Sequence, residues 1–157
     1  MSQPTLTREG IAVALFALIQ ALPGLATPPS RRLMFWGDVP PENQPTAFLA
    51  EGNHASTNDP NGLPDIWRFS YKVYLYAYSA DLTVAPASLL NPLLDALEAA
   101  LKPVQFGPPG FPGSMQVLGD TTGRIRHAWI AGPIETDEGS LGAQAVALVP
   151  IEIEVVL

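Results

Sequence analysis

The strongest constraint on the fold of this chain is a long alternation of residues between Trp67 and Tyr78. Successive side chains of a β-strand point to opposite faces, so the alternation predicts one face made of Trp67, Phe69, Tyr71, Val73, Leu75 and Ala77. The other face then carries Arg68, Ser70, Lys72, Tyr74, Tyr76 and Tyr78. At ~3.3 Å per residue such a strand is ~40 Å long, about twice the usual length, which predicts a long hairpin or a strand that extends past the domain body.

The two faces of this strand predict different environments. The face that begins with Trp67 is apolar, so we expect it to lie in the hydrophobic core. The second face is rich in tyrosine, whose ring buries area while its hydroxyl stays hydrated, so it suits a margin covered by a helix or by another protein. A sheet face that is simply half-buried is the alternative.

Two helices are predicted. Thr7 is a suitable N-cap, and Ile11, Leu15, Leu18, Ile19 and Leu22 recur at helical spacing up to Pro23-Gly24. Val13 and Phe16 make the opposite side apolar as well, which indicates either self-association or a helix buried in the core. The second helix is predicted from the leucines between positions 89 and 101, and Pro92 fits it only in the first turn, with Asn91 as a possible cap, or at a kink.

The remaining segments predict strands and loops. Strands are expected at residues 30–36, 46–50, 115–118, 124–133 and 144–156, with Pro150 at an edge position or a bulge. Residues 52–64 and 102–114 are rich in Gly, Pro and polar residues and predict flexible loops. The order of elements predicts an α+β fold, a mostly antiparallel mixed sheet with two helices packed on one face, in a single domain over residues 1–157.

Composition excludes several classes of protein. The chain has no cysteine, so disulfide frameworks, thiolate catalysis and cysteine-ligated zinc are excluded. Its formal net charge of −7 argues against tight binding of nucleic acid, but it suits a surface that DNA passes without binding. The apolar run at 10–22 is too short to span a bilayer and lacks a basic leader, so we expect a soluble protein made in the cytoplasm.

Catalytic and metal-binding patterns are weak. His54 and His127 lack a second ligand at metal-site spacing. The carboxylates of Glu135, Asp137 and Glu138 are better explained as a solvated acidic turn than as acid/base groups or cation ligands, and Glu152 and Glu154 as a solvent-facing strand edge. We therefore expect no enzyme activity, no cofactor and no metal.

Several segments, taken in order, carry a resemblance to a known family. They are TRE at 7–9, RLMFWGDVP at 32–40, QP at 44–45, the aromatic strand after PDIW at 64–67, LLNPLLDAL at 89–97, QVLG at 116–119, RHAWIAG at 126–132 and QAVALVPI at 144–151. In this order the chain resembles the tail terminator, or tail-completion, proteins of long-tailed bacteriophages and phage-derived particles. The resemblance covers nearly the whole chain, although no single motif is diagnostic.

The resemblance implies a structural virion protein. Such proteins form hexameric rings at the head-proximal end of the tail tube, stop its polymerisation, and dock to the head connector or stopper, while DNA passes through the lumen without specific binding. The protein would be assembled in the host bacterial cytoplasm. Each contact in a ring joins two different patches. The expected subunit interface comprises Val13, Phe16, Arg68, Lys72, Tyr74, Tyr76 and Tyr78, and the expected contact with the tube or connector comprises Asn58, Asp59, Phe106, Pro108 and Phe111.

Two alternative functions stay open. One is a head-completion or neck adaptor protein of the same particle. The other is a small-ligand-binding module or small hydrolase that uses a cleft beside the long strand, with His127 or the carboxylates at 135–138.

Overall fold

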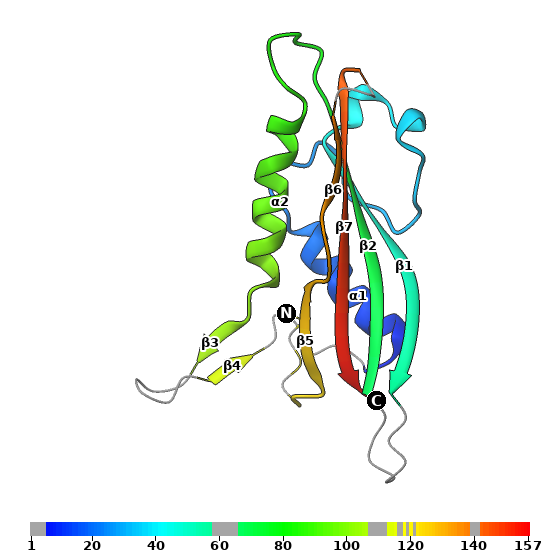
Figure 1. Cartoon of the computed structure of the whole chain (residues 1–157), viewed down its shortest axis with the longest axis vertical. Helices are drawn as coiled ribbons and strands as arrows, with labels where there is room; N and C mark the ends of the chain where they lie inside the picture. Colours follow the sequence, from blue (N-terminus) through cyan, green and yellow to red (C-terminus); the bar gives the residue numbers. More distant parts are fainter. Residues whose placement is uncertain are drawn as a thin grey trace.

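The computed structural model describes residues 6–57, 66–106, 113–115, 118, 120, 122–138 and 142–157. Figure 1 shows a long sheet with both helices on one side. The elements are α1 (Arg8–Gln20), the 3₁₀ turns η1 (Trp36–Asp38) and η2 (Pro41–Asn43), β1 (Thr46–Thr57), β2 (Ile66–Tyr78), α2 (Ala87–Leu101), β3 (Val104–Phe106), β4 (Gly113–Met115), β5 (Ile125–Ile130), β6 (Glu135–Glu138) and β7 (Gln144–Val156).

The main sheet has five antiparallel strands in the order β1-β2-β7-β5, with β6 also paired to β7. The long strand predicted from the sequence is β2, and it pairs with β7 over its whole length, from Ile66 opposite Val156 to Tyr78 opposite Gln144. A single bridge, between Ser30 and Phe48, is parallel. The α+β fold expected from the order of elements is confirmed.

The core lies between the sheet and the two helices. The inward positions of β2, from Phe69 to Ala77, and of β7, from Ala145 to Val155, pack against α1 and α2. On α2 the predicted leucine stripe is buried at Leu90, Leu93, Leu97 and Leu101. Since full burial of one leucine side chain contributes roughly 1.5–3 kcal/mol, this stripe holds α2 on the sheet. We refer to the helix-covered side as the inner face and to the opposite side as the outer face.

The N-terminal helix begins and ends as its sequence predicts. The Thr7 hydroxyl caps α1 by accepting a hydrogen bond from the Gly10 N–H at 3.1 Å. After the helix, Gly24 has a φ of +83°, a backbone conformation that side chains disfavour. No helix within the described ranges is long and apolar enough to cross a membrane.

The strand expected at residues 30–36 is wrong. Only Ser30 joins the sheet, through hydrogen bonds with Ala47 and Leu49 on the free edge of β1. The chain then leaves the edge and crosses the outer face, where Trp36 packs against a small apolar cluster around Tyr76. The indole is partly buried there, and this packing takes the chain away from the β1 edge.

The expected loop at residues 52–64 is also corrected in part. Strand β1 continues to Thr57, well past the predicted end at residue 50, because β2 supplies hydrogen-bond partners along its length. A register shift between Glu51 and His54 accommodates the irregular sequence. At Gly52 an added Cβ would lie 3.0 Å from the Ser70 carbonyl, so the close approach of the two strands there favours glycine. Residues 58–65 lie outside the described part.

Three other expectations change. The predicted loop at 102–114 contains the β3–β4 hairpin, and the predicted acidic turn at 135–138 is strand β6. Pro92 lies inside α2, which begins at Ala87, so Asn91 is not a cap. The strand predicted at 124–133 corresponds to the shorter β5, whereas the one predicted at 115–118 shares only Met115 with β4, and Leu118 lies in a turn.

Pro150 lies in an interior strand, β7, and not at the edge or bulge expected from the sequence. It stands opposite Lys72 of β2, and its carbonyl accepts the Ala131 N–H at 2.9 Å on the other side of β7. The N and O of a strand residue point the same way, so the missing N–H faces the break between β5 and β6. No ladder hydrogen bond is lost there.

Candidate assembly surfaces

The outer face of the sheet carries an ion-pair cluster at the end where β2 begins. The Arg68 guanidinium lies 3.6 Å from Glu152 and 3.6 Å from Glu154, and Arg126 lies 3.8 Å from Glu154. Arg68 also sits 5.7 Å from the ring centre of Trp129. These charges are partly exposed and satisfy one another within the chain, so each pair contributes little to stability.

A second outer-face cluster lies at the other end of β2. Tyr76 packs on Phe48, with a ring-centre distance of 5.4 Å, and on Val39. Its side chain is 4% exposed, and its hydroxyl donates a hydrogen bond to the Met34 carbonyl at 3.0 Å. Burial, with a smaller contribution from Tyr74, raises the pKa of Tyr76 to about 12. The chain itself therefore covers Tyr76.

Next to this cluster lies the apolar segment, which we define as Leu33–Phe35. Leu33, Met34 and Phe35 are 43%, 42% and 63% exposed, respectively. Large apolar side chains exposed together in this way mark interaction sites more often than isolated ones do. The segment follows directly from the point where the chain leaves the β1 edge.

Arg31 anchors the start of this segment. Its guanidinium binds Glu9 of α1 through two hydrogen bonds and lies 2.9 Å from Glu51 of β1. The hydrogen bonds with Arg31 lower the pKa of the Glu9 carboxyl, and the same bonds raise the pKa of Arg31. This arrangement holds the chain just before the apolar segment, and the Tyr76–Met34 hydrogen bond holds the segment at its middle residue.

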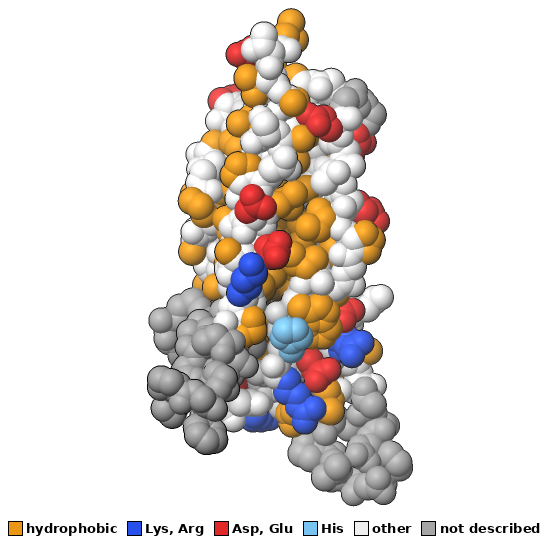
Figure 2. Space-filling view, turned by 60° about the vertical axis from the view of Figure 1, so that its left-hand side comes forward, with side chains coloured by type: hydrophobic (Ala, Val, Ile, Leu, Met, Phe, Trp, Pro, Cys, Tyr) orange, Lys and Arg blue, Asp and Glu red, His pale blue; other side chains and the backbone are white. Residues whose placement is uncertain are grey.

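A groove opens at the opposite edge of the sheet, between α2 and β5, and we call it the α2–β5 groove. It encloses about 580 Å³. Its lining residues are Glu98, Leu101, Lys102, Pro103, His127, Ala128, Trp129, Ile130, Gly132 and Ile134. In Figure 2 hydrophobic side chains form a band along this side of the molecule, with a few charged groups beside it.

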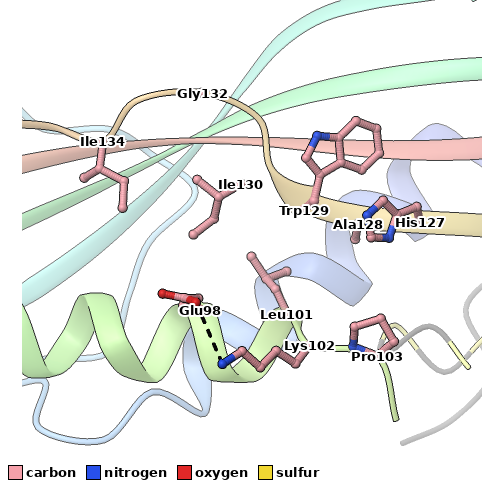
Figure 3. Close-up of a pocket in the computed structure, with 10 residues that line it drawn as sticks. All are labelled: Glu98, Leu101, Lys102, Pro103, His127, Ala128, Trp129, Ile130, Gly132 and Ile134. Carbon is pink, nitrogen blue, oxygen red and sulfur yellow. Dashed lines mark ion pairs between the residues drawn. The ribbon is translucent and has the colours of Figure 1, made fainter. Parts of the chain in front are cut away.

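The floor and rim of the groove differ. Figure 3 shows Leu101 reaching from α2 and Ile130 from β5 toward the space between them, while Glu98 and Lys102 form an ion pair along the helix at 3.8 Å. His127 and Trp129 stack at the other rim, with ring centres 4.8 Å apart. Ile134 is 36% exposed where the chain passes from β5 to β6. The groove therefore suits an apolar guest with a polar margin.

The described part of the chain offers no arrangement typical of a metal centre. No group of three or more His, Asp or Glu side chains converges there. His54 stacks edge-on against Phe69 with ring centres 4.6 Å apart, far along the sheet order from His127. On β6 the carboxylates at 135, 137 and 138 are all exposed, and Glu138 accepts the Ala87 N–H at the start of α2 at 3.0 Å.

Two polar side chains have structural roles that the sequence did not reveal. Asp120 is 2% exposed and accepts hydrogen bonds from the Thr122 N–H at 2.9 Å and the Ile125 N–H at 2.7 Å. Burial opposes ionisation, but these hydrogen bonds outweigh it and lower the pKa of Asp120. Tyr71 is fully buried on the inner face, and burial raises the pKa of its hydroxyl. The signal for Asp120 was its position two residues before a threonine in a turn.

The residues expected at the subunit interface do not form one surface. Val13, 51% exposed, and the half-buried Phe16 belong to α1 on the inner side, whereas the five β2 residues belong to the outer face. Among these five, Arg68 is ion-paired and Tyr76 is buried, while Lys72 is exposed and Tyr74 and Tyr78 are half-buried. The expected tube-contact residues Asn58, Asp59, Pro108 and Phe111, and the side chain of Phe106, lie outside the described residues.

Comparison with known proteins gives a likeness of fold. No family model matches the sequence, and no curated protein matches it. Among solved structures, the chain is similar to one from the "Virion of native gene transfer agent (GTA) particle", with a TM-score of 0.55 and 11% sequence identity. The match covers 98% of this chain and 100% of that chain. At this identity the likeness establishes a shared fold.

Proposed function

From this shared fold we propose that the chain is a structural subunit of a phage-like particle and acts as a tail terminator. In this role copies form a hexameric ring on the head-proximal end of the tail tube, end its polymerisation, and present a surface to the head connector or stopper. The observation that carries the proposal is the coverage of the fold match, 98% of this chain and 100% of that of a virion chain. The order of sequence segments that resembles tail terminators supports it independently.

The surface of the protein fits a subunit of an assembly better than a free monomer. Large apolar side chains are exposed at Val13, Leu33, Met34, Phe35, Leu82, Val84 and Ile134. Covering such side chains with sister subunits or neighbouring virion proteins removes apolar surface from water, which favours association. The partners in this proposal are the tail tube protein, the connector and other copies of the chain, and the role needs no cofactor or catalysis.

The acidic composition suits a ring through which DNA passes. A net charge of −7 per subunit repels phosphates and prevents the release of counterions that drives binding to DNA. The expected location is the head-proximal end of the virion tail, after assembly in the host bacterial cytoplasm. An alternative in the same particle is a head-completion or neck adaptor protein, whose ring would have a different number of copies.

The groove favours a second class of function. A volume of about 580 Å³ falls in the range of small-molecule sites, and Leu101, Ile130 and Ile134 give the groove an apolar lining. This reading predicts a monomer that binds a small molecule. It ranks below the assembly role because the exposed apolar segment lies elsewhere on the molecule and would have no part in it.

Imaging with tail tubes separates these functions. Purified protein is mixed with tail tubes of the phage-like particle and examined by negative-stain electron microscopy. The proposal predicts an annulus at one end of each tube. Annuli that bind connectors but ignore tubes would indicate the neck adaptor, and protein that decorates neither would contradict a role in the particle.

A further inference from the structure

We propose that the inner face of the sheet binds one buried water molecule between Tyr71 of β2 and His54 of β1, and that this water holds the edge strand at its bulge. The inference starts from two polar atoms, the Tyr71 hydroxyl and Nε2 of His54. Both are shut off from solvent, and neither has a hydrogen-bond partner among the described residues. The proposal concerns the single subunit and does not depend on the proposed function.

A bulge in β1 turns His54 toward the interior. Glu51 stands opposite Tyr71 and His54 stands opposite Phe69, so two residues of β1 face the single residue Ser70 of β2 between these pairs. In an uninterrupted strand the side chains alternate, so His54 would lie on the outer face, opposite to the face of Glu51. The bulge reverses this orientation, and bulges commonly re-aim a side chain in this way. The histidine therefore enters the apolar side of the sheet through an irregularity of the backbone.

The two side chains meet on the inner face. The His54 ring packs edge-on against Phe69 at a ring-centre distance of 4.6 Å and lies 6.2 Å from the ring centre of Tyr71. Tyr71 is 1% exposed, and Phe69 is fully buried. The Tyr71 hydroxyl and His54 Nε2 thus belong to one buried neighbourhood, yet they do not bond each other.

One water molecule satisfies both atoms. A buried polar atom without a partner destabilises the folded state, and such atoms are rare in native proteins. Water is the smallest molecule that both donates and accepts, and buried waters typically join polar groups that have no other partner. The Tyr71 hydroxyl can donate to the water oxygen, and the water can donate to Nε2 of a neutral His54 ring whose proton is on Nδ1.

The charges beside the site favour water over an ion. Burial raises the pKa of the Tyr71 hydroxyl, and the charges of Glu51, Arg31 and Glu9 also act on it, which places the hydroxyl near this group. Arg31 binds both carboxylates, so their charge is already compensated. Glu51 stands opposite Tyr71 and offers the water a further acceptor.

The variant Tyr71→Phe tests the site through the sign of its effect. With a bridging water, the change removes one partner of the water and leaves Nε2 of His54 less well satisfied, so the unfolding equilibrium constant should rise by about tenfold. Without a water, the change removes an unpartnered buried hydroxyl, and the constant should stay the same or fall, which would overturn the proposal. Tyr78→Phe, on the outer face, is the matched control and should change the constant by less than about twofold.

A double-variant cycle tests whether the two residues share one water. His54→Phe keeps a ring against Phe69 and removes Nε2. Because either single change already breaks the bridge, Tyr71→Phe/His54→Phe should cost less than the sum of the two single changes. Additive costs would show that the two polar atoms have separate environments and would overturn the bridge. Amide exchange at residues 54–57 should accelerate in each single variant, since the water holds this part of β1.

A crystal structure of the wild-type protein that resolves ordered water tests the site directly and needs no variant. It should show one water within about 2.7–3.2 Å of both the Tyr71 hydroxyl and His54 Nε2. A direct hydrogen bond between these two atoms, or a site with neither a water nor a contact, would overturn the proposal. Neither result bears on the ring or the tail tube, so this inference and the proposed function fail separately.

Discussion

The hydroxyl of Tyr76 donates a hydrogen bond to the backbone carbonyl of Met34 at 3.0 Å, which joins the outer face near the end of β2 to a segment 42 residues earlier. The sequence predicts this face to be covered by a helix or another protein, or to be half-buried; at Tyr76 the segment that leaves the free edge of β1 covers it instead. The bond also presents Leu33–Phe35 to solvent in a fixed position.

Removing this hydroxyl should loosen the apolar segment without disturbing the core. Tyr76→Phe keeps the ring against Phe48 and leaves the Met34 carbonyl without its donor, so we expect unfolding to become easier by about 1 kcal/mol. Amide exchange in residues 33–39 should accelerate. Tyr74→Phe is the matched control, since no hydrogen bond of the Tyr74 hydroxyl supports the segment; equal effects of the two changes would contradict this role of Tyr76.

The same tyrosine predicts a loss of stability at high pH. Its folded-state pKa is about 12, above the ordinary value of 10.0, so its neutral form is favoured in the folded protein. This contribution is fully present below pH 10 and disappears as the pH rises toward 12. Denaturant midpoints measured across that window should fall less steeply for Tyr76→Phe than for wild type; parallel curves would show that Tyr76 titrates normally.

Asp120 predicts a loss of stability in acid. Its folded-state pKa lies below the ordinary value of 3.8, so its contribution is present above that pH and is lost as the pH falls through the lower folded-state pKa. Asp120→Asn places an amide against the Ile125 N–H and should cost about 1–3 kcal/mol at neutral pH, with a flatter acid limb. Asp95→Asn, on the exposed side of α2, is the control and should leave midpoints unchanged.

Substitution of Pro92 should increase the stability of the folded protein. This residue lies inside α2, where proline removes one intrahelical hydrogen bond to the Ser88 carbonyl. Pro92→Ala should raise the unfolding free energy by about 1–3 kcal/mol, partly offset by the greater freedom of the unfolded chain. Thermal melting measures this directly. A lower melting temperature would mean that the proline is required for the position of α2 on the sheet.

The elements with strong periodicity could be predicted from the sequence. The alternation in β2 and the leucine stripe of α2 assign their buried faces correctly, because burial on one side of a regular element leaves a repeating pattern. The Thr7 cap follows from local backbone chemistry, which needs no knowledge of the rest of the fold.

The surfaces could not be predicted in the same way. Residues 30–36 have a composition typical of a strand, yet Trp36 packs on the outer face against the cluster that contains Tyr76. This contact joins distant parts of the chain, and no local sequence pattern encodes it. Residues 53–57 are polar and have a composition typical of a loop. They form a strand because the backbone of β2 supplies hydrogen-bond partners. The α2–β5 groove arises where a helix and an edge strand diverge, so its lining residues have no common sequence signature.

The central claim is that copies of this chain close into a ring, and native mass measurement of the purified protein over a range of concentrations tests it most directly. The account predicts a discrete species at six times the 16.7 kDa mass of the chain, with no larger open-ended polymers. A protein that remains at the mass of one chain at every concentration, also in the presence of tail tubes, would contradict it.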